Sequence, residues 1–177
     1  MALISKIKGT DNIEYNVRDD VSVWGGRNLL SVNKYINVSG GPDLITYDGW
    51  ITDSTPTSDS RSWGYANCNW KLSLQADTYI LTWYVKIATE NTNKGIGIYP
   101  SSGSSLWVST GSSGPFGTVG TNSKIITLTT DTDIGIMFKI YDGSVRLKLE
   151  RGTKSTDWSP APEDIAHVNG ECLELLS

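Results

Sequence analysis

The chain has little of what marks a disulfide-stabilised or membrane protein. Its 177 residues contain two cysteines, Cys68 and Cys172, which lie far apart without the spacing of metal ligands, so two reduced thiols are expected. No segment is apolar for long enough to span a membrane, and the opening MALISKIKG lacks the apolar run of a signal peptide. We therefore expect folding in a cytoplasm and no membrane partner.

Clustered positive charge is also missing. The chain has 15 Lys and Arg against 19 Asp and Glu, a net charge of −4, and its basic residues form no long run. Because phosphate backbones are bound by clustered cations, no nucleic-acid partner is expected.

Groups for catalysis are scarce. The single histidine, His167, lies in the polar tail beyond the prolines, and no HExxH, CxxC or phosphate-binding glycine loop occurs. Several carboxylate pairs have the setting of turn or cap residues: Asp19-Asp20, Asp131 with Asp133, and Glu163-Asp164. A glycosidase would need two carboxylates facing each other across a cleft, which a sequence does not reveal. We predict that the protein is not an enzyme, with a polysaccharide depolymerase as an alternative.

A cofactor is not expected, apart from a structural calcium ion. Hard oxygen ligands are abundant, but no EF-hand spacing is present. Glu150, at the end of the last predicted strand, is the single candidate ligand, and the alternative is a solvated edge residue.

What the sequence does contain is Gly, Ser, Thr and Asn in quantity, with 7 Trp and 8 Tyr but only 2 Phe. This composition is typical of short strands joined by polar turns. Alternating runs predict strands at 44–51, 66–74, 78–88, 94–99, 105–109, 124–129, 133–141 and 144–149. The run 78–88 places Tyr79, Leu81, Trp83, Val85 and Ile87 on one face. The pattern predicts an all-β fold, either a β-sandwich or a jelly roll.

Two shorter runs, 3–8 and 12–18, are joined by Gly9-Thr10-Asp11 and predict an N-terminal β-hairpin. A lone hairpin is marginal in water, so it should pack against its own domain or a neighbouring subunit. We divide the chain into a hairpin arm at 1–23, a jelly-roll body at 24–158 and a proline-stiffened tail at 159–177. The Ser/Gly/Thr-rich segment 101–123 contains Leu106-Trp107-Val108, which predicts a short strand between loops.

Strand alternation predicts which aromatic residues face outward, because neighbouring side chains take opposite faces. In 66–74 the set Ala66, Cys68, Trp70, Leu72 and Leu74 is expected in the core, so Asn67 and Asn69 face out, with Trp63 and Tyr65 if the strand extends back. Elsewhere Tyr84, Tyr99, Trp107, Tyr141, Lys86 and Lys139 fall on outward positions.

Rings mixed with amides and cations suit carbohydrate, whose C–H faces stack on rings while its hydroxyls need polar partners. The candidate carbohydrate-binding residues are Arg61, Trp63, Tyr65, Asn67, Asn69, Tyr84, Trp107, Lys139 and Tyr141. The alternative is that these rings pack under loops or against another subunit.

Two motifs frame the predicted body: GGRNLL at 25–30 and LKLERGTKSTDWSPAPED at 147–164. Together they resemble the two ends of the carbohydrate-binding-module-like jelly-roll domains of bacteriophage tail and minor structural proteins. The segment EYNVRDD also resembles the start of phage fibre and tail proteins. The resemblance implies a virion structural protein of the tail, baseplate, a fibre or the capsid surface. Its expected partners are other virion proteins, copies of itself, with a trimer favoured, and host surface polysaccharide. The alternative is a purely architectural capsid decoration or fibre protein.

Within this resemblance, Trp158 is expected to plug one open end of the sandwich near Asn28 and Leu29. Pro160 and Pro162 fix φ and remove donors, which predicts a rigid exit from the body. The apolar end of the tail, with Leu173, Leu175 and Leu176, is expected to dock on its own sandwich or on a neighbour.

Overall fold

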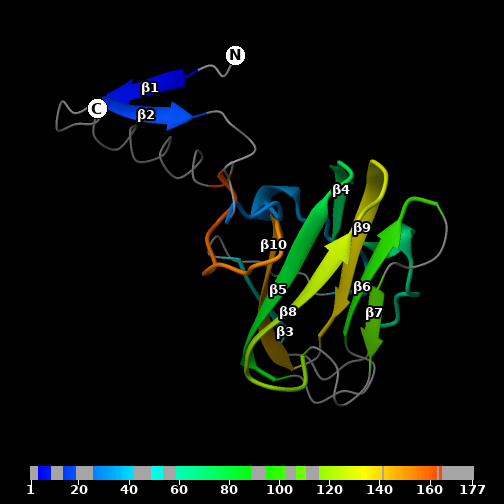
Figure 1. The fold of residues 1–177 in the computed structure, drawn as a ribbon. Helices are drawn as coiled ribbons and strands as arrows, with labels where there is room; N and C mark the ends of the chain where they lie inside the picture. Colours follow the sequence, from blue (N-terminus) through cyan, green and yellow to red (C-terminus); the bar gives the residue numbers. More distant parts are fainter. Residues whose placement is uncertain are drawn as a thin grey trace.

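The computed structural model describes residues 4–8, 14–18, 26–41, 49–53, 59–88, 95–102, 107–110, 116–140, 142–162 and 164. Two antiparallel four-stranded sheets face each other in these residues (Figure 1). One sheet has the order β3 (Trp50–Asp53), β10 (Gly143–Arg151), β5 (Thr78–Ile87) and β8 (Gly120–Thr127). The other has the order β4 (Trp70–Leu74), β9 (Thr132–Lys139), β6 (Gly95–Pro100) and β7 (Trp107–Thr110). The predicted all-β sandwich is confirmed.

The predicted hairpin is also confirmed. Strands β1 (Ile4–Lys8) and β2 (Glu14–Arg18) pair antiparallel, with Ile7 opposite Tyr15, and form a two-stranded sheet of their own.

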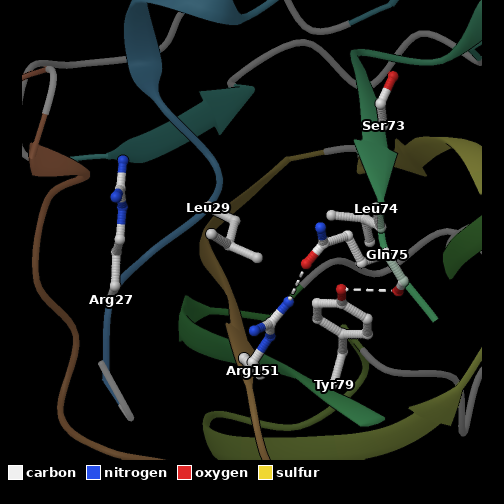
Figure 2. Close-up of a pocket in the computed structure, with 7 residues that line it drawn as sticks. All are labelled: Arg27, Leu29, Ser73, Leu74, Gln75, Tyr79 and Arg151. Atoms are coloured by element: carbon white, nitrogen blue, oxygen red, sulfur yellow. Dashed lines mark hydrogen bonds between the residues drawn. The ribbon is translucent and has the colours of Figure 1, made fainter. Parts of the chain in front are cut away.

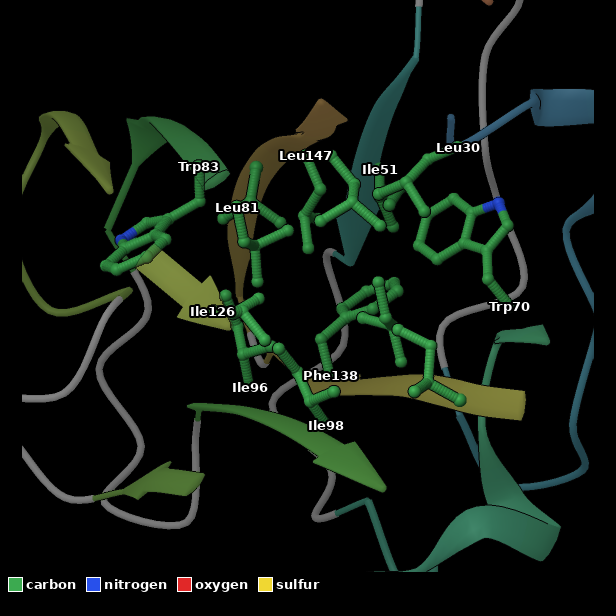
Figure 3. Close-up of a cluster of buried hydrophobic side chains, with 14 of the residues drawn as sticks. Leu30, Ile51, Trp70, Leu81, Trp83, Ile96, Ile98, Ile126, Phe138 and Leu147 are labelled. Carbon is green, nitrogen blue, oxygen red and sulfur yellow. The ribbon is translucent and has the colours of Figure 1, made fainter. Parts of the chain in front are cut away.

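Alternation decides which side chains fill the space between the sheets. Leu81 and Trp83 of β5 and Leu147 of β10 point inward from one sheet, and Ile98 and Phe138 point inward from the other (Figure 3). All five are buried. The predicted apolar face of β5 is confirmed except at its end, where Ile87 is 51% exposed.

The prediction for 66–74 is wrong in its first half. The strand begins at Trp70, and Tyr65–Asn67 form a 3-10 turn, so alternation cannot be extended back to Trp63. Cys68 is buried on the outer face of the sheet and not between the sheets. It packs against Gly135 of β9, where a Cβ would lie 2.5 Å from the Cys68 sulfur, and Gly135 faces outward because its neighbours Ile134 and Ile136 face the core. Ala66 is exposed. Of the predicted strand 44–51, the structure describes residues 49–51, and β3 begins at Trp50.

Each sheet carries a covering segment on its outer face. Residues 59–69 cross β9 and residues 152–160 turn back over β10, so these two strands are covered on both faces. The second covering segment also meets the start of the body, where Asn28 donates a hydrogen bond to the carbonyl of Ser159 at 3.2 Å. Figure 1 shows these two ends side by side.

Asp164 completes this junction. Its carboxylate accepts hydrogen bonds from the Ser31 hydroxyl and from the backbone N–H of Val32 at 3.0 Å. Val32 begins the 3-10 turn Val32–Lys34, whose N-cap residue is Ser31, and Asp164 adds a second acceptor to the start of this turn from a distant part of the chain. The segments at the two motifs, 28–32 and 159–164, are therefore hydrogen-bonded to each other and join the two ends of the body.

Candidate functional site

The nine predicted carbohydrate-binding residues do not form one face. Six lie together on the outer side of the β4-β9-β6-β7 sheet, in or beneath the covering segment 59–69: Arg61, Trp63, Tyr65, Asn67, Asn69 and Lys139. Tyr84 lies on the outer side of the opposite sheet. Trp107 is the first residue of β7, but the structure describes only its backbone, and Tyr141 lies outside the described residues.

An ionic layer is buried under segment 59–69. Arg61 is 6% exposed and donates from Nη2 to the Asp59 carboxylate at 2.6 Å and to the Phe138 carbonyl at 2.7 Å. Its Nη1 donates to the Asn69 side chain at 3.0 Å. The Lys139 ammonium donates to the backbone carbonyls of Arg61 and Asp59. These contacts fix the segment on the sheet.

This layer corrects the roles predicted for Arg61, Asn69 and Lys139. All three are buried and satisfied by protein groups, so they cannot supply hydrogen bonds to a sugar. Alternation in 66–74 predicts an outward Asn69, and alternation in 133–141 predicts an outward Lys139, but segment 59–69 covers this face of the sheet. Burial lowers the pKa of Lys139, an effect that the neighbouring Asp59 opposes.

The same layer supports half-exposed rings. The Lys139 ammonium lies 4.9 Å from the centroid of the Trp63 ring, and Lys71 lies 5.1 Å from that of Tyr65. Tyr65 packs over Gly135, where a Cβ would lie 3.0 Å from its ring. Tyr99 lies across from Gly135 in the strand pairing. We call Trp63, Tyr65 and Tyr99, with the adjoining Asn67 and Lys71, the ring platform.

On the opposite sheet, aromatic rings surround one arginine. The Arg146 guanidinium lies 4.2, 4.7 and 5.3 Å from the ring centroids of Trp158, Trp50 and Tyr84. Trp158 donates to the Leu147 carbonyl at 3.2 Å and covers Gly49, whose φ of +78° favours glycine. Trp158 therefore lies across the outer face of β10, and its predicted place as an end plug is corrected.

Tyr84 holds the same covering segment, because its hydroxyl donates to the Thr156 carbonyl at 2.9 Å. Burial raises the pKa of this phenol, and the charge of Glu150 raises it further. Its ring is thus committed to Arg146 and its hydroxyl to the backbone, which leaves Tyr84 a structural role in this sheet.

The predicted calcium ligand, Glu150, is occupied by other partners. It is fully buried and pairs with Lys148 at 3.2 Å. It also accepts hydrogen bonds from the N–H and hydroxyl of Thr156, both at 2.8 Å. The alternative of a solvated edge residue is wrong, and a calcium ion would have to displace these partners. Among the described residues there is no group of three or more His, Cys, Asp or Glu placed to hold a metal.

One end of the sandwich is hollowed (Figure 2). This end groove has a volume of about 380 Å³ and is lined by Arg27, Leu29, Ser73, Leu74, Gln75, Tyr79 and Arg151. The Arg151 guanidinium donates to the Gln75 amide oxygen at 3.0 Å and lies 3.0 Å from the Asp77 carboxylate. A second hollow of about 240 Å³ shares Ser73, Leu74 and Gln75 and continues to Asp131 and Asp133.

The carboxylates weighed as catalytic groups act locally where they are described. Asp131 accepts from the N–H of Ala76 at 2.8 Å and is a turn residue, as predicted. Asp133 lies in β9 and accepts from the hydroxyl of Ser73, its partner across the strand pair with β4, so the prediction of a turn or cap residue is wrong there. His167 and the Asp19-Asp20 pair lie outside the described residues.

Sequence reasoning missed the Arg146 cluster and the end groove. Alternation in β10 places Arg146 outward, opposite Tyr84 in the strand pairing, but this register is visible only in the structure. The end groove is formed by segments far apart in the sequence, so no local pattern marks it.

Comparison with known proteins gives no further guide, since no family model, curated protein or solved structure matches this chain. Within the described part of the chain, no helix is long and apolar enough to cross a membrane.

Proposed function

We propose that this chain is a bacteriophage virion structural protein whose sandwich is a jelly-roll domain that binds host surface carbohydrate through the ring platform. The motifs at 25–30 and 147–164 support the virion assignment through their resemblance to tail and minor structural proteins. The same resemblance supports location in the virion after folding in the host cytoplasm. No covalent step belongs to the proposal.

The observation that supports glycan binding best is the mounting of Trp63 and Tyr65. Both rings remain half-exposed while the buried Asp59-Arg61-Lys139 layer fixes the segment that carries them. Rings held in place lose little side-chain freedom when a ligand stacks on them, which reduces the entropic cost of binding. Asn67 and Lys71 lie beside the rings and can meet sugar hydroxyls.

The test is cosedimentation of the purified protein with host cells and with extracted wall polysaccharide. We expect saturable binding that Trp63→Ala abolishes and Trp50→Ala preserves. Trp50 is a matched control, because it is also a half-exposed tryptophan but lies on the opposite sheet against Arg146. Equal binding by both variants would contradict the assignment of the ring platform. Release of reducing ends would instead support a depolymerase.

An architectural role is the second candidate, and one observation favours it. The edge strand β8 and its surroundings expose large apolar side chains, with Val119 62%, Ile87 51% and Ile125 49% exposed. Such side chains along an edge suit contact with another subunit or virion protein. Mass photometry tests this role, since a defined oligomer without polysaccharide binding would favour it. We propose a homo-oligomer, with a trimer as the first expectation, because repeated sites would raise the avidity of weak glycan contacts.

A further inference from the structure

The end groove has the form of a small-molecule site separate from the ring platform. Its volume of about 380 Å³ falls within the range of ligand pockets, about 300–1,000 Å³. Leu29 and Leu74 are half-buried and present apolar surface to it, while Tyr79 is buried and donates from its hydroxyl to the Gln75 carbonyl at 2.9 Å. The groove therefore combines an apolar wall with a fixed polar rim.

Arg151 is the best-positioned polar group of this rim. The Gln75 side chain accepts from Nη2 of its guanidinium at 3.0 Å (Figure 2). The Asp77 carboxylate lies 3.0 Å from Nε. No described residue accepts a hydrogen bond from its Nη1. A guanidinium fixed on one side and open on the other can receive a carboxylate through paired N–H donors.

The lining of the groove contains Arg27 and Arg151 and no carboxylate. Asp77 offsets the charge of Arg151 from outside the lining. The preference for a carboxylate therefore rests on the directed N–H donors of Arg151 and not on an excess of positive charge. In the adjoining hollow, Asp131 and Asp133 offer acceptors for uncharged hydroxyls.

We propose that the end groove binds a carboxylate-bearing sugar residue of an acidic polysaccharide. The carboxylate pairs with Arg151, the C–H face of the ring lies on Leu29 and Leu74, and hydroxyls meet Gln75 and Ser73. This inference rests on the proposed glycan-binding function for its ligand class and on the groove itself for its site. A polysaccharide chain that reached both sites would be held by a charged sugar in the end groove and by a stacked sugar on the ring platform.

The experiment is an NMR titration of the ¹⁵N-labelled full chain with a galacturonate trimer, the neutral galactose trimer of the same linkage, and inorganic phosphate. We expect the galacturonate trimer to shift the amides of Gln75, Ala76 and Gly152, with binding that weakens as salt rises. The neutral trimer should bind at least about tenfold more weakly. A neutral trimer or phosphate that bound as tightly as the galacturonate trimer would overturn the proposal.

Variants assign the site. Arg151→Gln should weaken galacturonate binding at least about tenfold, and Arg151→Lys should weaken it less, because lysine keeps the charge but not the paired donors. The ion pair that these two substitutions alter is partly exposed, with 32% exposure for the Arg151 side chain and 41% for that of Asp77, so both variants should fold. Lys124→Gln, an exposed position on β8 outside the groove lining, should leave binding unchanged. Unchanged affinity in Arg151→Gln would overturn the proposal.

Trp63→Ala separates this inference from the proposed function. It should leave the groove shifts intact, while Arg151→Gln should leave Trp63-dependent binding of neutral wall glycan intact. Loss of the groove shifts in Trp63→Ala, with that variant still folded, would contradict two separate sites.

Discussion

Replacing Arg61 by methionine should destabilise the protein strongly. Arg61 supplies the cation for Asp59, and both side chains are almost fully buried, at 2% and 3% exposure. Methionine fills much of the same space but leaves the Asp59 carboxylate without its cation and the Phe138 carbonyl without this donor. Breaking a buried ion pair in this way costs about 3–5 kcal/mol, a large part of the stability of a single domain.

The double variant Asp59→Leu/Arg61→Met tests whether the cost comes from the stranded charge. With both charges removed, we expect at least about 1–2 kcal/mol of the lost free energy of unfolding to be recovered, because two buried apolar side chains need no counter-charge or hydrogen-bond partner. The Asn69 amide oxygen still loses its donor in both variants, which keeps the recovery incomplete.

Urea unfolding followed by tryptophan fluorescence measures both effects. With a denaturant slope of about 2 kcal/mol per M, Arg61→Met should lower the midpoint by about 1.5–2.5 M. A decrease of less than about 0.5 M, or a double variant less stable than Arg61→Met, would refute the idea that a buried ionic layer fixes segment 59–69.

Trp158→Ala should lower the free energy of unfolding by about 1–3 kcal/mol in the same assay, because it removes the ring over Arg146; an unchanged midpoint would contradict this. Asp164→Ala should cost about 1–2 kcal/mol through loss of its bonds to Ser31 and the adjoining turn, with Asp164→Asn losing less. Burial raises the pKa of Cys68 from 9.0 to about 12, so iodoacetamide at pH 9 should label it only after unfolding, as peptide mass spectrometry would show. Since the unfolded thiol ionises first, the unfolding free energy should decrease as pH rises from 9.0 towards about 12, and rapid labelling of the native thiol would contradict both statements.

The sequence predicted the sheets better than their covers. Alternation in β5, from Tyr79 to Val85, identifies a core face because successive side chains of a strand point to opposite faces of the sheet. It fails for Trp63 and Asn69, because the 3-10 turn at Tyr65–Asn67 has another period. An irregular covering segment has no periodic pattern of apolar residues. The strand that it covers depends on where the chain folds back, which the local sequence does not show.

Outward position also proved a poor guide to exposure. Lys148 and Glu150 occupy outward positions of β10, yet both are fully buried because the segment after Arg151 folds back over them. Charged residues at outward positions of a strand normally predict a solvent-exposed face. Here Thr156 lies over Lys148 and Glu150 and bonds to both, which shows that the two side chains do not face solvent. The same reversal moved Trp158 from the expected end of the sandwich to its face.

Glycan binding by the ring platform is tested by the affinity of a fragment of host wall polysaccharide for the wild type, Trp63→Ala and Trp50→Ala, measured by isothermal titration. We expect Trp63→Ala to bind at least about tenfold more weakly, and Trp50→Ala to bind within about twofold of the wild type. Equal affinities for the wild type and a folded Trp63→Ala would mean that the ring platform does not bind this glycan.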